Sequence, residues 1–263
     1  MGYALGEQAG GTLRDKMKAQ LTPGPLAALE ESPMGVWAIV PVKPLRRGKS
    51  RLAPALTVNE RTMLNRRLLI HTLEVLGQVE AIEQVLVVSR DTGALALARQ
   101  YGARTLQERG DSQLNLALRH ATSFLQAYRV GAVMVLPADL PLLEPADIQA
   151  LVAALEAPPA VVLAPDRHHE GTNALLMTPP GVIRYRYGPG SFARHREEAE
   201  AAGVRLRIVE RPGLAWDLDW PEDLQGVTLL APGFPWAAPS ARASLGEGDP
   251  ADVGEKKHAS SGR

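Results

Sequence analysis

The sequence predicts an α/β fold in which helices flank a mostly parallel central sheet. Short apolar runs alternate with helical patterns along the middle of the chain, which is the βαβ rhythm of such sheets. Hydrophobic residues make up 45% of the 263 residues, enough for a sizeable core. The chain contains no cysteine, so neither disulfides nor thiolate-bound metals are expected. No internal repeat divides it, and we expect one domain over residues 34–232.

Strands and helices alternate regularly in the first half of the domain. The apolar run VWAIVPV predicts a strand at 36–42. Thr57 and Glu60 have the spacing of a capping box, so a helix should begin just after Thr57, and leucines at helical spacing continue it to Leu76. The other elements expected in this half are strands at 84–89, 104–106 and 132–137 and helices at 92–101 and 113–128.

The second half is less regular, and the two ends of the chain differ from its middle. Residues 1–33 and 233–263 are rich in Gly, Pro, Ala and Ser and show little apolar periodicity, so we expect them to be disordered tails. Between residues 145 and 218 the patterns predict helices at 145–156 and 191–202 and strands at 160–164, 173–177, 205–209 and 214–218.

Charge and hydropathy exclude several classes of partner. The 29 basic and 29 acidic residues cancel, so no overall field favours nucleic acid or an anionic membrane. No apolar run reaches the roughly 18 to 20 residues needed to cross a bilayer, and the start of the chain lacks the apolar region of a signal peptide. We therefore expect a cytoplasmic protein with no nucleic-acid or membrane partner, in which any anion site is local.

A basic loop follows the first strand. Its Gly48-Lys49-Ser50 sequence matches the end of a P-loop, but Lys43 stands where that motif needs a glycine, and Pro54 interrupts the helix that should follow. A backbone phosphate cradle is therefore excluded, and the loop is expected to bind a polyanion through side chains. Its cations are Lys43, Arg46, Arg47, Lys49 and Arg51.

Three aspartates are candidate metal ligands. Asp139 follows the strand at 132–137, at the rim where α/β sheets bind ligands. Asp217 and Asp219 would project from one face of a strand at 214–218, and two such carboxylates repel each other unless a cation lies between them. Mg²⁺ is the natural cation for oxygen ligands. The alternatives are that Asp139 orders a turn, and that Asp219 caps a helix opened by Pro221.

Two further segments suit anions. In YGPGSFARH, a tight glycine loop leads to Ser191 at the start of a helix, where free amides can bind an anion or Ser191 can simply cap the helix. In PDRHHEGTNALLM, Thr172 offers a hydroxyl before a strand. The segment GDSQLNLAL at 110–118 suits contact with a base or ribose, or is a plain loop-to-helix junction. His168, His169 and His195 do not indicate zinc, because adjacent histidines do not face a common point.

Together these features indicate metal-dependent transfer of a nucleotidyl group. A basic loop, three aspartates and two anion-suited turns provide what that reaction requires. No serine–histidine–aspartate order or activated cysteine indicates a nucleophilic mechanism instead.

The motifs also resemble one family, the 2-phospho-L-lactate guanylyltransferases of coenzyme F-420 biosynthesis and their relatives that use phosphoenolpyruvate or 3-phosphoglycerate. The resemblance covers about Val36 to Leu224. It implies a compact Rossmann-like, GT-A-like nucleotidyltransferase domain, without the glycine-rich start of molybdenum-cofactor guanylyltransferases. The motifs that carry it are PVKPLRRGKSRLAP, PADLPLL, PDRHHEGTNALL, YGPGSFARH and WDLDWPEDL, in that order and spacing.

The resemblance implies roles for ten residues. Asp139, Asp217 and Asp219 match metal-binding aspartates for Mg²⁺, with two ions expected, and Lys43 matches a phosphate-contacting lysine. The residues expected to hold the phospho-acid are Thr172, Gly188 and Ser191, and those expected near GTP are Lys49, Arg51 and Asn115.

The implied reaction is transfer of GMP from GTP to the phosphate of the phospho-acid, with release of pyrophosphate and no need for a general base. A later transferase of the F-420 pathway is an expected partner. Two alternatives stay open: a transferase of the same fold that acts on a sugar phosphate or a pterin, and a nucleotide-binding regulatory module without turnover.

Overall fold

A computed structural model describes residues 35–108 and 113–230. The expected tails at 1–33 and 233–263 fall outside the described residues, as do positions 110–112 of the GDSQLNLAL segment. The strands are β1 (Val36–Val42), β2 (Ile82–Ser89), β3 (Arg104–Gln107), β4 (Ala132–Val135), β5 (Ala160–Pro165), β6 (Thr172–Thr178) and β7 (Arg205–Ile208). The helices are η1 (Ser50–Leu52), α2 (Val58–Gly77), α3 (Thr92–Gln100), α4 (Leu114–Gln126), α5 (Pro145–Ala153), α6 (Ser191–Ala201), α7 (Pro212–Ala215) and α8 (Pro221–Leu230).

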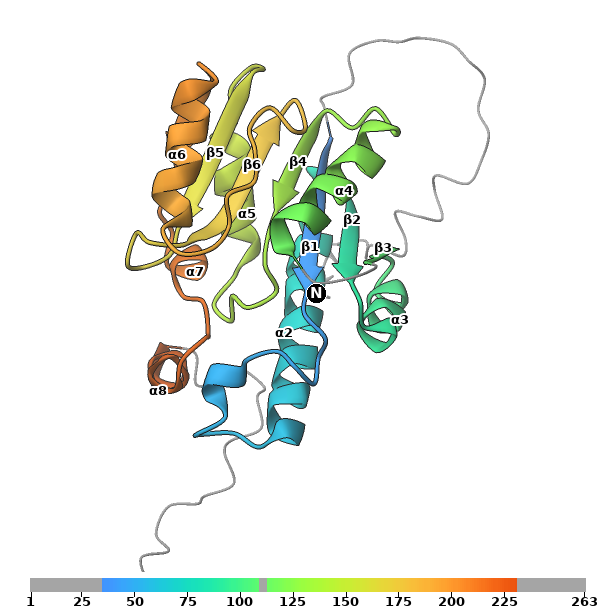
Figure 1. The fold of residues 1–263 in the computed structure, drawn as a ribbon, viewed down its shortest axis with the longest axis vertical. Coiled ribbons are helices and arrows are strands. Elements are labelled where there is room, and N and C mark those ends of the chain that lie inside the picture. The colour runs from blue at the N-terminus through green and yellow to red at the C-terminus, as the bar shows by residue number, and fades with distance from the viewer. Residues whose placement is uncertain (1–34, 109–112, 231–263) are drawn as a thin grey trace, which may run out of the picture.

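The seven strands form one sheet in the order β3-β2-β1-β4-β6-β5-β7 (Figure 1). β1 pairs in parallel with β2 and β4, β2 with β3, and β5 with β7. Only β6 runs antiparallel to its neighbours β4 and β5 within the described sheet. The predicted α/β class with a mostly parallel sheet is therefore confirmed.

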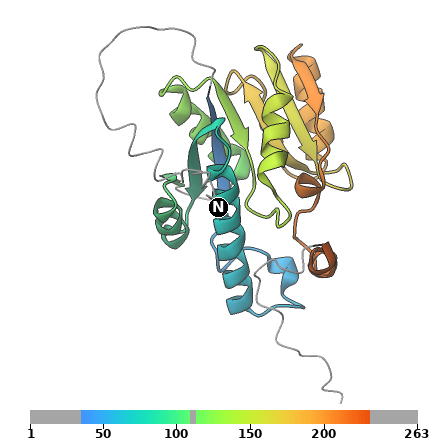
Figure 2. The same ribbon diagram turned by 180° about the vertical axis from the view of Figure 1, so that it is seen from behind.

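Helices cover both faces of the sheet, as Figures 1 and 2 show from opposite sides. One apolar cluster packs α2, α3 and α5 against one face, and a second packs α4 and α6 against the other. Alternate residues of β1 belong to different clusters, with Ala38 and Val40 in the first and Ile39 in the second. Because both faces are buried, the strand is a continuous apolar run rather than an alternating one.

The capping box predicted for α2 is confirmed. The Thr57 backbone N–H donates to Glu60 Oε2 at 2.7 Å, and the Glu60 N–H donates to Thr57 Oγ1 at 3.3 Å. These bonds satisfy N–H groups that the first turn of a helix leaves without partners. None of the helices in the described ranges is long and apolar enough to cross a membrane.

The strand predicted at 214–218 is wrong. Residues Pro212–Ala215 form the short helix α7, and the N–H groups of Leu214 and Ala215 both donate to Arg211 O at 3.0 Å. Proline at the first helical position favours this turn, because its fixed φ suits a helix and its missing N–H leaves no donor unpaired. β7 already pairs with β5 at this end of the sheet. Asp217 and Asp219 therefore lie in a loop between α7 and α8.

Candidate active site

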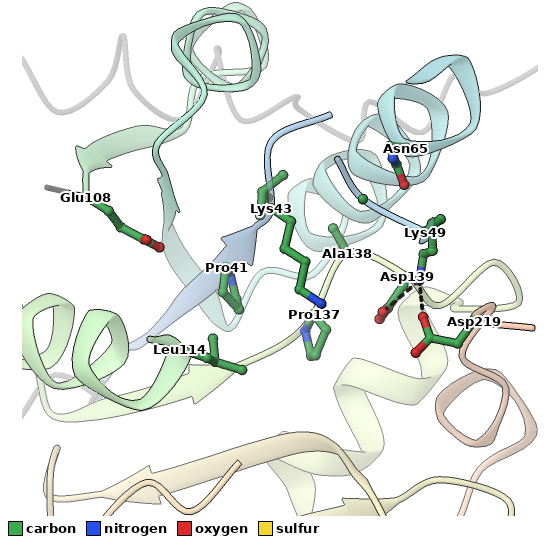
Figure 3. A pocket seen from close by; sticks show the side chains of 12 residues that line it. Pro41, Lys43, Lys49, Asn65, Glu108, Leu114, Pro137, Ala138, Asp139 and Asp219 are labelled. Carbon is green, nitrogen blue, oxygen red and sulfur yellow. Dashed lines mark hydrogen bonds and ion pairs between the residues drawn. The ribbon is translucent and has the colours of Figure 1, made fainter. Parts of the chain in front are cut away.

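A pocket opens at the carboxyl ends of β1 and β4, where ligands bind in α/β sheets. Lys43 and Lys49 from the basic loop line it together with Asp139 and Asp219 (Figure 3). At its other side Glu108 and Leu114 line the same pocket. Four of the ten predicted site residues thus meet in one place, although 176 positions separate the first of them from the last in the sequence.

The ammonium group of Lys49 lies between two of the predicted metal ligands. Its Nζ is 2.9 Å from Asp139 Oδ2 and 2.9 Å from Asp219 Oδ1. Arg51 Nη1 contacts the other oxygen of Asp219 at 3.1 Å. The Lys49 side chain is only 8% exposed, and its backbone is left-handed with φ of 55°. Asp139 and Asp219 therefore converge on a single cation position.

The pKa values reflect this charge arrangement. Burial acts to lower the pKa of Lys49, but Asp139 and Asp219 outweigh it and the pKa is raised. Burial acts to raise the pKa of Asp219, but Lys49, Arg51 and Lys43 outweigh it and the pKa is lowered. Both groups are therefore charged at neutral pH, as an ion pair requires.

Asp217 lies beside this pair without joining its ion pairs. Burial, followed by the negative charge of Asp139 and then that of Asp219, raises the pKa of Asp217 to about 6. Its Oδ1 accepts a hydrogen bond from Asn173 Nδ2 at 3.5 Å. Within residues 35–108 and 113–230 no three carboxylate or imidazole side chains are close enough to form a metal centre on their own.

Asp223 positions the loop that carries Asp219. Its Oδ2 accepts hydrogen bonds from the N–H groups of Asp219 at 2.8 Å and Trp220 at 2.6 Å. Its Oδ1 accepts from Arg167 Nη2 at 2.5 Å. The contacts of Asp219 do not support the alternative in which it caps α8, because its two carboxylate oxygens bond Lys49 and Arg51.

Asp139 and the same loop are also joined through the backbone. The N–H of Leu218 donates to the carbonyl of Asp139 at 3.0 Å. Leu218 packs in a small apolar cluster with Leu52 and Val227, which brings η1 and α8 together beneath the pocket. The alternative that Asp139 merely orders a turn does not account for its side chain, whose Oδ2 binds Lys49.

Thr172, Ser191 and His195 form a second group, which is buried. Their residues are 4%, 2% and 0% exposed. The Arg186 N–H donates to His195 Nε2 at 2.9 Å, and Thr172 Oγ1 is 2.9 Å from Nδ1. Burial, followed by the charges of Arg194 and Arg186, lowers the pKa of His195 to about 4, so the ring is neutral at pH 7.

The tautomer of His195 follows from these contacts. Because Nε2 accepts a hydrogen bond, the single proton of the neutral ring is on Nδ1. Nδ1 therefore donates to Thr172 Oγ1, which also accepts from Ser191 Oγ at 3.3 Å. A hydroxyl that accepts two hydrogen bonds still has its own hydrogen to donate. Thr172 can thus donate its hydroxyl hydrogen to an anionic oxygen. His195 makes Thr172 a donor in this direction, and the sequence alone did not indicate this role of His195.

The glycine turn before α6 differs in detail from its prediction. Gly190, with φ of 67°, is the N-cap, so Ser191 lies inside the helix and does not cap it. The N–H of Ser191 donates to Gly188 O and that of Phe192 donates to Glu170 O. The first amides of this helix are therefore already bonded and leave little of the predicted amide anion site. Gly188 has φ of 124°, a backbone conformation that favours glycine.

Asn115, on α4, supports this turn from the same face of the sheet. Its Oδ1 accepts from the Tyr187 N–H at 2.8 Å, and its Nδ2 donates to the Tyr187 carbonyl at 3.0 Å. Both polar atoms of the side chain thus fix the backbone that leads to Gly188. Contact with guanosine, predicted for Asn115, stays a prediction that has to compete with these bonds.

The loop before Thr172 is ordered by a residue that sequence reasoning missed. The carboxylate of Asp166 accepts hydrogen bonds from the N–H groups of His168, Glu170 and Gly171 at 3.0, 2.9 and 2.8 Å. An aspartate at the end of a strand, followed by polar residues, is a signal for such a turn. Next to Thr172, Asn173 donates to Asp217, so the first two residues of β6 contact both the buried group and a carboxylate beside the pocket.

Comparisons with known proteins show which family this chain resembles. The model of the family "Guanylyl transferase CofC like" matches residues 36–233. A phosphoenolpyruvate guanylyltransferase of Rubrobacter xylanophilus is 44% identical over 191 residues, which are 73% of this chain and 92% of that protein. A 2-phospho-L-lactate guanylyltransferase of Methanothermobacter thermautotrophicus is 32% identical over 200 residues, 76% of this chain and 87% of that one.

A solved structure supports the fold. A protein of Desulfovibrio desulfuricans G20, described as a nucleotide-diphospho-sugar transferase, superposes with a TM-score of 0.62 at 16% identity. The match covers 78% of this chain and 91% of that one.

Proposed function

The chain belongs to the CofC-like guanylyltransferase family of nucleotidyl-transferring enzymes, and on that basis we propose that it transfers GMP from GTP to the phosphate of a small phospho-acid. Phosphoenolpyruvate is the first acceptor to test, because a relative at 44% identity is named a phosphoenolpyruvate guanylyltransferase. 2-Phospho-L-lactate and 3-phosphoglycerate also present a carboxylate beside a phosphate. The observation that carries the proposal is the meeting of Lys43, Lys49, Asp139 and Asp219 in one pocket.

In the proposed reaction, an oxygen of the acceptor phosphate forms a bond to the α-phosphorus of GTP. The bond from that phosphorus to pyrophosphate breaks, and pyrophosphate leaves with its electron pair. A phosphate oxygen is already anionic near pH 7, so no side chain has to remove a proton. The described residues that line the pocket include cations and carboxylates but no histidine, which is consistent with this chemistry.

Side chains of the basic loop take the role of phosphate contacts in this proposal. Lys43 points into the pocket (Figure 3), and Lys49 and Arg51 bring further positive charge to the same rim. Such fixed cations stabilise negative charge that spreads over the phosphates in the transition state. On the other side of β4, Thr172, Gly188 and Ser191 are proposed to hold the phospho-acid, and the free hydroxyl hydrogen of Thr172 supports this role.

The carboxylates fit a magnesium site. Asp139 and Asp219 already share one cation, and Asp139 Oδ1 is buried without a hydrogen-bond partner among the described residues. Protein sites bind Mg²⁺ with one or two carboxylates and complete its shell with substrate phosphates. We propose that Asp139, Asp217 and Asp219 hold two Mg²⁺ ions when substrates are bound. Bound Mg²⁺ would supply charge neutralisation at the transferring phosphoryl group.

The product would be a guanosine diphosphate linked to the acid, an activated compound for a later transferase. The family resemblance implies a place in coenzyme F-420 biosynthesis, which we include in the proposal.

The test is an assay with GTP, Mg²⁺ and each of the three phospho-acids in turn. We expect pyrophosphate and a product with the mass of the guanosine diphosphate-linked acid for at least one of them, and neither with Asp139→Asn. Turnover with a sugar phosphate or a pterin alone would instead indicate the other acceptor class. Nucleotide binding without pyrophosphate release for every acceptor would indicate a regulatory module.

A further inference from the structure

The pocket extends beyond the residues that the proposed reaction uses. Glu108 follows β3, and its backbone N–H donates to Ser89 O at 3.0 Å, which anchors it to the end of β2. Figure 3 shows its carboxylate directed into the pocket, across from Lys43. No described residue donates a hydrogen bond to that carboxylate. A shielded acceptor that faces an open pocket is suited to donors on a ligand.

The order of the strands places Glu108 at a suitable distance from the reacting centre. β3 lies three strand positions from β4, which with a spacing of about 4.8 Å per strand is roughly 14 Å. That span suits a nucleoside monophosphate whose phosphate lies at Asp139 and whose base lies at the end of β3. The opposite direction, past β4 towards β6, leads to the buried Thr172 group. The base of the nucleotide therefore has room on the β3 side.

Apart from Lys43, the walls between these two ends are apolar. Pro41, Leu114 and Pro137 line the pocket there, and Leu114 is 39% exposed although it is a large hydrophobic residue. Apolar walls with one well-placed polar group are typical of sites for flat organic ligands. A purine ring would cover the exposed Leu114 side chain while its polar edge reaches Glu108.

The chemistry of a carboxylate favours one purine. An ionised carboxylate only accepts hydrogen bonds, and its two oxygens match two adjacent donors. Guanine offers this pair as its N1–H and its N2 amino group, whereas adenine presents the N1 lone pair in that position. We propose that Glu108 accepts both guanine donors and thereby selects GTP over ATP. This assignment rests on the proposed guanylyl transfer and extends it to the nucleobase.

The electrostatic environment of Glu108 is consistent with this role. Burial raises the pKa of Glu108, while the charge of Arg90 acts in the opposite direction. A partly desolvated carboxylate gains more from two N–H donors than a fully hydrated one does. The charge of Arg90 favours the ionised form, which the acceptor role requires.

The experiment compares GTP, ITP and ATP in the wild type and in Glu108→Gln. ITP keeps the N1–H of guanine but lacks the N2 amino group. We expect Glu108→Gln to lower kcat/KM for GTP by roughly 10- to 100-fold, the range given by loss of a bidentate pair. ITP and ATP should change much less, so the preference for GTP over both should collapse. Glu80→Gln, at an exposed position away from the pocket, is the matched control and should leave all three values unchanged.

Binding of each nucleotide by calorimetry, with Mg²⁺ and no acceptor, separates this inference from the proposed function. If the wild type binds GTP but turns over no phospho-acid, the proposed acceptor fails while the ratio of GTP to ITP affinity still tests Glu108. An equal loss of affinity for GTP, ITP and ATP in Glu108→Gln, with an unchanged melting temperature, would overturn the assignment. So would an unchanged preference for GTP.

Discussion

At the scale of single residues, the ammonium of Lys49 lies between Asp139 and Asp219, the position that the proposed Mg²⁺ site would assign to a metal ion. Two carboxylates so close repel each other, and a cation between them removes that repulsion. A buried ion pair adds little net stability because of its desolvation cost, but removal of one partner leaves an uncompensated buried charge and is destabilising. The ion pairs thus hold the two aspartates in position, and in the proposed Mg²⁺ site Lys49 would compete with the metal ion for them.

Lys49→Met tests this competition. We expect the variant to be less stable than the wild type in the absence of divalent cations, because Asp139 and Asp219 lose their shared partner. Added Mg²⁺ should raise its melting temperature by more than it raises that of the wild type, because no ammonium has to be displaced. Arg51→Met is the control, since Arg51 is 56% exposed and contacts only one of the aspartates. An equal Mg²⁺ effect in Lys49→Met and wild type would contradict the competition.

His195 gives the stability a defined pH dependence. Its folded pKa of about 4 lies below the usual unfolded value of about 6.5, so between these values the unfolded chain binds more protons. The contribution is complete above pH 6.5 and is lost as the pH falls towards 4, at up to about 1.4 kcal/mol per pH unit for one group. Burial lowers the pKa of His71 as well, so His71 also makes the folded state less stable as the pH falls.

The share of His195 is measured by comparing urea unfolding of the wild type and His195→Asn at several pH values between 4 and 7. Asparagine does not titrate, and its amide can still donate to Thr172. The free energy of unfolding should therefore fall less steeply with decreasing pH in the variant. The difference in slope should correspond to the uptake of at most one proton on unfolding. Equal slopes in the two proteins would show that His195 does not remain neutral in the folded state.

At the scale of elements, the sequence predicts well those helices and strands whose signals are local. The capping box at Thr57 and the apolar run of β1 are such signals, and both are confirmed. The prediction of a strand at 214–218 was wrong because a short apolar stretch does not show whether a neighbouring strand is available for pairing. The position of Asp219 depends on Asp223, which bonds the Asp219 N–H and the side chain of Arg167. Contacts between residues far apart in the sequence leave no periodic pattern, so the sequence could not predict this one.

Asp223→Ala tests the connection between α8 and the site. The change removes the acceptor for two loop N–H groups and leaves Arg167 without its partner. We expect Asp219 to lose its fixed position and activity to fall by roughly 10- to 100-fold, the usual effect of removing a residue that orients a ligand. Exposed Glu222→Ala, in the same helical turn, should leave activity unchanged. Full activity in a folded Asp223→Ala protein would show that Asp219 is positioned without it.

At the scale of the whole molecule, the sheet order decides which residues meet. The β1, β4 and β6 ends are neighbours, so Lys43, Asp139 and Thr172 follow one another across the sheet although 129 positions separate the outer two. The βαβ rhythm predicted parallel strands but not the reversed direction of β6, because pairing between distant strands depends on the whole fold. The motifs predicted the candidate site residues, whereas their grouping into a pocket and a buried cluster required the structure.

The last prediction concerns the extent of the domain, which the sequence sets at residues 34–232. All seven strands, both large apolar clusters and the ten predicted site residues lie between residues 36 and 230. A shortened chain of residues 34–232 should therefore keep the melting temperature and the kcat/KM of the full chain. A chain that ends at residue 220 is the contrast, because it loses Asp223 and the buried Val227 that packs with Leu218. It should melt at a lower temperature and lose activity. If instead the 34–232 chain also melts lower, the residues outside it contribute to the folded core, and the predicted domain boundaries are wrong.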